Sequence, residues 1–318
     1  MNGGLWITGP HSAHSRLTRR TVMQIASMTT IPVPFLGSEA LAAGAVNRHQ
    51  LRTRFRALYP NVYVPTEMTP TLAERVAGAW LWSQRKGVVA GQAAAALHGT
   101  KWVDRTTTIE LIHTNPRAPD GVITRRDMLL DGEAVSRRGV TVTTCERTAF
   151  DIGRRSALNV GVARLDALLN ATGCAIDDVR ALAARHPGAP GLRRLETTLT
   201  FVDAGSQSPR ESWLRLLLVR NGLPRPVTQI PVVVDGLPVA YLDMGWEEWM
   251  VAVEYDGDQH RTDRWQYVKD IRRLEMLKDL GWIVIRVVAE DGSAAILRRV
   301  GAALTQRQST VHQRRHIS

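Results

Sequence analysis

Cysteine is scarce in this sequence, and long apolar runs are absent from it. The two cysteines, Cys145 and Cys174, cannot form a disulfide framework and lack the Cys-x-x-Cys spacing of structural zinc sites. Two isolated cysteines fit a protein of a reducing compartment. We expect both to be small buried hydrophobic side chains rather than nucleophiles. No segment approaches the roughly 18 to 20 consecutive apolar residues that a membrane-spanning helix needs. The sequence therefore predicts a cytoplasmic protein without a membrane partner.

Size and charge indicate the kind of partner instead. The 318 residues are 44% apolar, enough for two domains with cores of their own, and the formal net charge is +11. The surplus lies in residues 1–205, which carry 25 Lys and Arg against 16 Asp and Glu. A basic surplus of this size predicts a polyanionic partner, nucleic acid and in particular DNA. A general preference for arginine would give the same count without a function.

The first residues look like an export signal only in part. RLTRRTVMQIASM (residues 16–28) with ALAAGA (residues 40–45) is similar to a twin-arginine signal and its cleavage site. The apolar segment of a signal is uninterrupted, whereas here it is broken by Thr30, Pro32, Pro34 and Glu39. We therefore expect residues 1–34 to be a disordered extension, with Met28 as an alternative start.

Residues 35–68 have the order of a winged helix-turn-helix. Two short helices are predicted around a turn at residues 44–47, with Ser38 and Asn47 as N-caps, and LYPNVYVP (residues 58–65) alternates like a strand. The second helix is basic, and we expect its four arginines to contact DNA: Arg48, Arg52, Arg54 and Arg56. A surface helical hairpin with solvated arginines would give the same local pattern.

Residues 69–195 are expected to form an α+β module. Residues 71–99 are rich in apolar and small residues and are predicted to be helical, and strands are predicted at residues 107–114, 121–127 and 139–155. The run GQAAAALHGTKW (residues 91–102), a strand, and then GVTVTTCERTAFDIGRR (residues 139–155) resemble the central module of AbiEi-like antitoxins of type IV toxin–antitoxin systems. That resemblance implies a preceding winged helix and DNA binding.

A composition shift at residues 186–208 predicts a linker and a second domain at residues 206–304. Its first helix begins at Ser208 and Pro209 and ends before Gly222. Strands are predicted at residues 226–236, 238–246, 249–257 and 282–288, with a helix before the last one. A closing helix at residues 291–304 and a flexible tail at residues 305–318 complete an α/β domain.

Acidic side chains gather where two of these strands end. Asp243 follows an apolar run, and Glu254 and Asp256 share one face of the next strand because side chains alternate with period two. If the strands are neighbours, the carboxylates repel one another unless a cation lies between them. Mg²⁺, held by Asp243 and Glu254, is the cofactor that this arrangement predicts. Alternatively, Asp243 and Asp256 only cap turns, since Asp256–Gly257 is turn chemistry.

The whole region resembles the PD-(D/E)XK nuclease superfamily, in particular the endonuclease-like domains related to very-short-patch repair endonucleases. The matching segments are SPRESWLRLLL (208–218), LDMGW (242–246), VEYDGDQH (253–260) and DIRRLEMLKDLGWIVIRV (270–287). The resemblance implies a restriction-endonuclease-like fold, with Asp243 as the metal-binding acid, Glu254 as the glutamate of the E-x-K motif and Glu211 as the helix glutamate. Ser208 and Glu211 also have the spacing of a capping box, which would give Glu211 a structural role.

One residue departs from that superfamily pattern. Asp256 occupies the position of the usual lysine, and a carboxylate cannot balance the charge of the site. The related E-x-D-G-x-x-H pattern implies that His260 acts as general acid or base and that Lys269 or Arg272 supplies positive charge. Arg272 and Arg273 could also only form exposed ion pairs.

The sequence thus predicts a DNA-binding protein with α+β and α/β domains and a metal-dependent endonuclease-like activity. The alternative is a transcriptional regulator or antitoxin whose nuclease domain has lost catalysis, as the missing lysine would allow. A toxin and its antitoxin fused in one chain is a third possibility.

Overall fold

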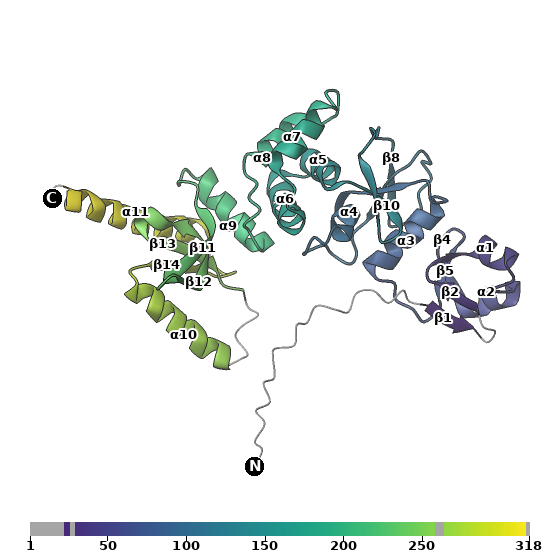
Figure 1. Cartoon of the computed structure of the whole chain (residues 1–318), viewed down its shortest axis with the longest axis horizontal. Helices are drawn as coiled ribbons and strands as arrows, with labels where there is room; N and C mark the ends of the chain where they lie inside the picture. Colours follow the sequence, from purple (N-terminus) through teal and green to yellow (C-terminus); the bar gives the residue numbers. More distant parts are fainter. Residues whose placement is uncertain (1–21, 26–28, 258–263, 316–318) are drawn as a thin grey trace, which may run out of the picture.

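The computed structural model describes residues 22–25, 29–257 and 264–315. Within these ranges the chain is a mixture of helices and several small sheets, as expected for an α+β multidomain protein. Figure 1 shows that the parts follow one another along the long axis of the molecule, with the helices α5 to α8 between the sheets. None of the helices in these ranges is long and apolar enough to cross a membrane.

Residues 35–68 fold into two short helices beside a small antiparallel sheet. The helices are α1 (Gly37–Ala42) and α2 (Arg48–Arg54), and the sheet order is β3 (Phe35–Leu36), β5 (Val62–Pro65) and β4 (Phe55–Tyr59). The predicted N-cap Asn47 is confirmed, because its side chain accepts a hydrogen bond from Gln50 N, and Asn47 N donates in turn to Gln50 Oε1. Ser38 is not a cap, since α1 already starts at Gly37.

Ordered structure begins before residue 35. The strands β1 (Val22–Ile25) and β2 (Thr29–Pro32) pair antiparallel inside the segment for which the sequence predicted a disordered extension. Ile31 is buried and packs in one cluster with Phe35, Leu51 and Phe55. Burial of this apolar side chain stabilises the segment against the helices that follow.

The second part is built on a five-stranded sheet. Its strand order is β8 (Val122–Arg125), β7 (Ile109–Ile112), β6 (Val88–Ala90), β10 (Val140–Thr143) and β9 (Ala134–Arg137). Helices α3 (Leu72–Trp82) and α4 (Gly91–Leu97) pack against it. The helical prediction for residues 71–99 is wrong between these two helices, because the chain pairs there with β7 as the strand β6. Tyr59 and Val62 of the first sheet join the same core as Val76 and Ala79 of α3, so this core extends across the predicted boundary near residue 68.

Four helices follow: α5 (Cys145–Arg155), α6 (Leu158–Thr172), α7 (Ile176–Ala184) and α8 (Leu192–Leu199). The predicted strand at residues 139–155 was therefore wrong beyond its first residues. The strand β10 ends at Thr143, and Thr144 then caps α5 by accepting a hydrogen bond from Arg147 N. A cap at this threonine turns the chain from the strand into a helix.

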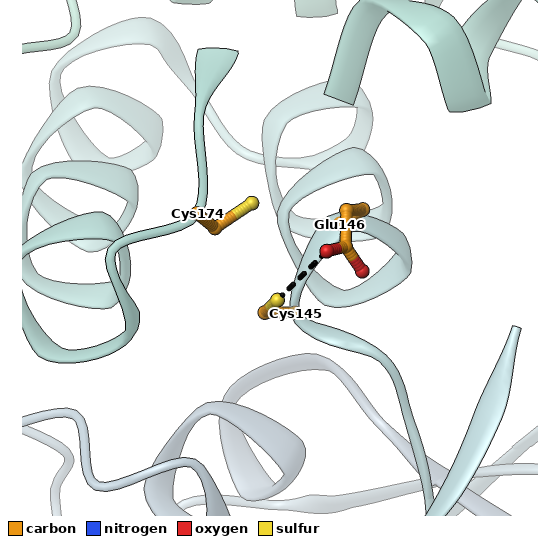
Figure 2. Close-up of side chains that lie close together, drawn as sticks. All are labelled: Cys145, Glu146 and Cys174. Atoms are coloured by element: carbon orange, nitrogen blue, oxygen red, sulfur yellow. Dashed lines mark hydrogen bonds between the residues drawn. The ribbon is translucent and has the colours of Figure 1, made fainter. Parts of the chain in front are cut away.

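The two cysteines lie at the ends of these helices. Cys145 opens α5, and Cys174 follows the left-handed Gly173 that ends α6. Figure 2 shows their side chains beside Glu146. Cys174 is a buried core residue, as predicted. Cys145 is only half-buried, and its thiol donates to Glu146 Oε1 at 3.1 Å.

The C-terminal part has the predicted element order. Helix α9 (Pro209–Arg220) precedes β11 (Val227–Val234), β12 (Leu237–Trp246) and β13 (Val251–Tyr255), which pair antiparallel in sequence. Helix α10 (Arg264–Asp279) then leads to β14 (Ile283–Val287), which is parallel to β13. Side chains of α9 and α11 (Ser293–Arg315) pack on one core of this sheet, and those of α10 pack on the other.

The predicted flexible tail differs from the structure, because α11 continues to Arg315. Leu304 is buried against the sheet, and Arg307 Nη2 donates to the carbonyl of Gly281. These two contacts hold the polar end of the helix.

The hairpin of the edge strand β11 and its neighbour β12 exposes several large apolar side chains. Five large side chains are exposed on the hairpin of β11 and β12: Val227, Val233, Leu237, Val239 and Tyr241. Pro231 lies in the middle of β11, opposite Tyr241. Proline within a strand fits this position, since it cannot donate to a hydrogen-bonded ladder and is therefore confined to edges.

Candidate functional site

Helix α2 presents three of its arginines to solvent. The side chains of Arg48, Arg52 and Arg54 are exposed, and none of their guanidinium groups makes a hydrogen bond or ion pair with any residue in the described ranges. Their charges are therefore available for phosphate groups. Arg56 was wrongly placed with them: it lies on β4, is half-buried, and donates from Nη2 to the carbonyl of Met68 at 2.8 Å.

The hairpin that follows α2 is fixed to α1 at its tip. Asn61 Nδ2 donates to Ser38 Oγ at 2.8 Å, and Ser38 N donates to Asn61 Oδ1 at 3.0 Å. Asn61 adopts a positive φ of 61°, which asparagine tolerates better than most residues. These two hydrogen bonds hold the tip of the hairpin against the start of α1.

A second group of candidate residues lies in the C-terminal sheet. The ladder between β12 and β13 ends at the pair Met244 and Val253, so the next pair in this register would be Asp243 and Glu254. At this position a side-chain hydrogen bond takes the place of the backbone ladder: Asp243 Oδ2 accepts a hydrogen bond from Tyr255 N at 2.9 Å. The two acids thus lie on neighbouring strands, in the arrangement that the sequence predicts.

Positive charge reaches these acids from α10. Arg273 forms a bidentate ion pair with Glu254, with Nη1 3.0 Å from Oε2 and Nη2 bonded to Oε1. Its Nη2 also donates to the carbonyl of Tyr241 at 2.8 Å. The sequence predicted Lys269 or Arg272 for this role, but both are exposed. The packing of α10 on the sheet turns Arg273 toward the acids instead.

Asp256 pairs with a second arginine. Arg286 on β14 contacts Asp256 Oδ2 at 2.5 Å. Asp243, Glu254, Asp256, Arg273 and Arg286 together line a pocket of about 310 Å³, which Asp270 and Leu274 of α10 also line. The site therefore contains opposed carboxylates and two guanidinium groups in place of a lysine.

Asp243 is the residue whose protonation the fold changes most within this pocket. Burial raises the pKa of Asp243 to about 7, and the negative charges of Glu211 and Glu254 add to this rise. The Tyr255 N–H and the Arg273 charge act in the opposite direction. Asp243 is therefore partly protonated near neutral pH, and a cation that replaced the proton would remove the repulsion.

Glu211 fulfils half of the predicted capping box. Its backbone N–H donates to Ser208 Oγ at 3.2 Å, but its side chain accepts from Gln207 N at 2.9 Å rather than from the N-cap. Glu211 is buried, and its charge reaches Asp243. It thus both closes the start of α9 and contributes to the electrostatics of the pocket. His260 lies outside the described residues.

The donor set of this pocket suits a hard divalent cation. Asp243 and Glu254 offer carboxylate oxygens from adjacent strands, which Mg²⁺ prefers over nitrogen or sulfur ligands. Both oxygens of Glu254 are bonded to Arg273. Each of these oxygens keeps a second lone pair, so a cation bound there would share Glu254 with Arg273.

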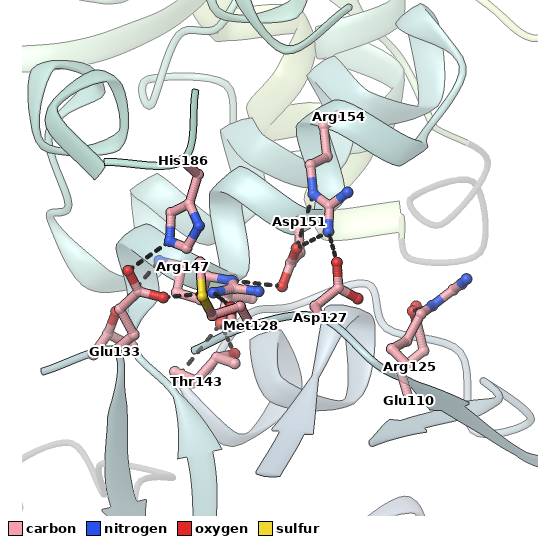
Figure 3. A network of polar contacts seen from close by, with 12 residues as sticks. Glu110, Arg125, Asp127, Met128, Glu133, Thr143, Arg147, Asp151, Arg154 and His186 are labelled. Carbon is pink, nitrogen blue, oxygen red and sulfur yellow. Dashed lines mark hydrogen bonds and ion pairs between the residues drawn. The ribbon is translucent and has the colours of Figure 1, made fainter. Parts of the chain in front are cut away.

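A third group of polar residues is buried beside the five-stranded sheet. Figure 3 shows Arg147 of α5 between Glu133 and Asp151. Arg147 contacts Glu133 Oε2 at 2.5 Å and Asp151 Oδ2 at 3.0 Å, and His186 Nε2 lies 2.7 Å from Glu133 Oε1. Burial alone would raise the pKa of Glu133, but its bonds with His186 and Arg147 hold that pKa below the usual value.

The sequence did not predict this network, which fixes α5 to the loops around it. Arg154 extends it to Asp127 on the loop after β8. Its only signal was the spacing of Arg147 and Asp151, four residues apart, which places both on one face of a helix. That signal was missed because residues 139–155 were interpreted as a strand.

Comparison with known families finds a similarity in this part of the chain. Residues 87–201 match the AbiEi antitoxin C-terminal domain. The matched range extends from the start of β6 to the end of α8, and it contains the whole network around Arg147. The resemblance to AbiEi-like antitoxins is thereby confirmed for this range.

The chain is also similar to two proteins of Mycobacterium tuberculosis. They are uncharacterized protein MT2308 of strain CDC 1551 / Oshkosh and uncharacterized protein Rv2248 of strain ATCC 25618 / H37Rv. Each is 27% identical over 234 residues, which span 72% of this chain and 84% of the relative. Because this length exceeds that of the antitoxin-like range, the similarity includes neighbouring parts of the chain as well.

Proposed function

We propose that this protein is a DNA-binding regulator of the antitoxin type, in which residues 35–68 act as a winged helix-turn-helix. The match of residues 87–201 to the AbiEi antitoxin C-terminal domain is the observation that carries the proposal. The basic surplus of residues 1–205 is consistent with a nucleic-acid partner.

Helix α2 is the element that we assign to the DNA. It follows α1 after a short turn and precedes the hairpin of β4 and β5, which is the order of a winged helix. Arg48, Arg52 and Arg54 would contact phosphates, because their charges have no partner among the described residues. Arg56 would not contribute, since Met68 already holds its guanidinium group.

The experiment that tests this proposal is a DNA-binding titration of the full chain. Fluorescence anisotropy with duplexes from upstream of its own gene should show saturable binding, stronger than that to an RNA duplex of the same length. Combined replacement of Arg48, Arg52 and Arg54 by alanine should weaken binding about tenfold or more. Binding that is absent, or unchanged in the triple variant, would reject the proposal.

A second function, metal-dependent hydrolysis of DNA phosphodiester bonds, is favoured by one observation. Asp243 and Glu254 lie on neighbouring strands and line one pocket. Together they would hold Mg²⁺, which when bound supplies an activated water and polarises the phosphate. Arg273 would neutralise charge in place of the missing lysine, but it would not serve as a base, because guanidinium groups remain protonated.

Cleavage of supercoiled plasmid in Mg²⁺ tests this second function. Activity should disappear with a chelator and in Glu254→Gln, whereas Glu248→Gln should retain it, because Glu248 is exposed in the same domain. Equal cleavage by wild type and Glu254→Gln would point to a contaminating nuclease. Absence of cleavage by the wild type would reject this second function.

A further inference from the structure

A site of a different chemical kind lies at the start of α5. Cys145, Glu146 and Cys174 each direct one atom toward a common centre, and these three atoms all lie within 4.8 Å of one another. Figure 2 shows the two sulfur atoms and the carboxylate converging from the start of α5 and from the loop after α6. These residues belong neither to the arginines of α2 nor to the pocket that Asp243 and Glu254 line.

Local structure fixes all three positions. The Thr144 cap sets the direction of the first turn of α5, which carries Cys145 and Glu146. Gly173, with φ of 69°, ends α6, and Cys174 N then donates to Thr172 Oγ1 at 3.3 Å. The cluster therefore joins two segments that are separated by a whole helix in the sequence.

The Cys145 thiol now donates to Glu146 Oε1 at 3.1 Å. A metal ion that bound both atoms would take the place of this proton. We propose that Cys145, Glu146 and Cys174 form a binding site for Zn²⁺. The site is independent of DNA binding and of phosphodiester hydrolysis.

The distances and the donor types fit this metal. Ligands about 2.3 Å from a tetrahedral zinc lie about 3.8 Å from each other. The three atoms lie within 4.8 Å of one another and Cys145 Sγ is 3.1 Å from Glu146 Oε1, so each separation needs to change by about one ångström at most. Thiolates select zinc over magnesium or calcium, which prefer oxygen. Cys145 and Glu146 are only half-buried, so water can reach the fourth position.

The helix start favours the charged form of the two ligands that α5 supplies, Cys145 and Glu146. The first turn of α5 carries the positive end of the helix dipole, which stabilises a thiolate or carboxylate placed there. Zinc binding releases the thiol protons, so affinity should rise with pH. With three protein ligands and water, the site would resemble an open zinc site more than a closed structural one.

Titration of the reduced full-length protein with Zn²⁺ against a chromophoric chelator tests the proposal. One ion should bind per chain, and Cys174→Ser and Glu146→Gln should each weaken binding about tenfold or more. Glu196→Gln is the control, because Glu196 is an exposed acid on α8 that is paired with Arg180. Its affinity for Zn²⁺ should equal that of the wild type.

Co²⁺ provides a readout that does not depend on stability. Wild type with Co²⁺ should show thiolate-to-metal charge-transfer absorption, which Cys145→Ser should reduce and the double cysteine variant should abolish. Absence of this absorption in the wild type would overturn the proposal. Formation of a disulfide between Cys145 and Cys174 in air, without zinc uptake by the reduced protein, would overturn it as well.

Discussion

Asp166 on α6 and Arg215 on α9 form an ion pair of 2.6 Å in which each side chain is only 1% exposed. Arg215 also bonds to the carbonyl of Phe201 and to Ser206 Oγ. The first helix of the C-terminal part is thereby attached to the antitoxin-like range. The boundary that the sequence predicts near residue 206 is a change of pattern, but the two sides share a buried ion pair.

Breaking this pair from one side should be costly. Arg215→Met leaves the buried carboxylate of Asp166 without its partner, so the free energy of unfolding should fall by about 3–5 kcal/mol. The double variant Asp166→Leu, Arg215→Met removes both charges and should be less destabilised than Arg215→Met alone. Urea unfolding followed by circular dichroism measures both. If the loss of unfolding free energy in the double variant equals the sum of the losses in Asp166→Leu and Arg215→Met alone, a direct pairing is contradicted.

The buried network of Figure 3 gives a second stability prediction. Glu133→Ala leaves Arg147 and His186 without their shared acceptor, and it should cost about 3–5 kcal/mol. Glu196→Ala, which breaks an exposed pair with Arg180, should cost about 1 kcal/mol or less. Thermal unfolding at neutral pH compares the two variants. Similar losses in both would mean that burial of the Glu133 pair has no special weight.

Asp243 should make stability depend on pH. Its pKa is about 7 in the folded state against 3.8 for the ordinary group, so the folded protein retains a proton that the unfolded chain has lost. The stabilisation is complete below the unfolded pKa and is lost as pH rises toward 7, by about 1.4 kcal/mol per pH unit. The variant Asp243→Asn has no carboxyl group to titrate at this position, so it should not show this loss of stability. Its stability relative to wild type should increase from pH 4 to 7 and then stay constant.

Mg²⁺ should compete with the same proton if the pocket binds it. The ion should then raise the melting temperature more at pH 8, where Asp243 is ionised, than at pH 6. Asp243→Asn should abolish the difference, whereas Glu248→Gln should preserve it. An equal shift at both pH values would indicate binding elsewhere on the chain.

The charge of α2 can be measured through salt dependence. In the double variant Arg52→Ala, Arg54→Ala, the slope of log K against log salt concentration should be shallower by about one to two, because DNA binding releases fewer counterions. The double variant Arg193→Ala, Arg220→Ala is the charge-matched control, because it removes two exposed arginines that lie outside α2. An unaltered slope in the first variant would show that α2 does not contact phosphates.

Much of the C-terminal fold could be predicted because its signals are local. Ser208 and Pro209 mark the start of α9, and strand alternation places Asp243 and Glu254 side by side once β12 and β13 pair. The role of Arg273 could not be predicted, because Lys269, Arg272 and Arg273 lie within five residues of one another. Only the rotation of α10 against the sheet decides which of them faces the pocket.

Errors arose where a local signal was outweighed by its context. Arg56 continues the basic pattern of α2, but the helix ends at Arg54 because the chain pairs as β4 from Phe55. Residues 139–155 begin as a strand, and the cap at Thr144 then starts α5. In both segments a single boundary residue changes the structure of those that follow.

The proline in β11 bears on how this protein behaves in concentrated solution. An open sheet edge with exposed valines, here Val227 and Val233, is a ready template for strand addition between molecules, and hence for aggregation. Pro231 removes one backbone donor from the middle of that edge. Pro231→Thr would restore the donor and also raise the β-propensity of the strand, so this conservative-looking change should lower solubility without touching the fold.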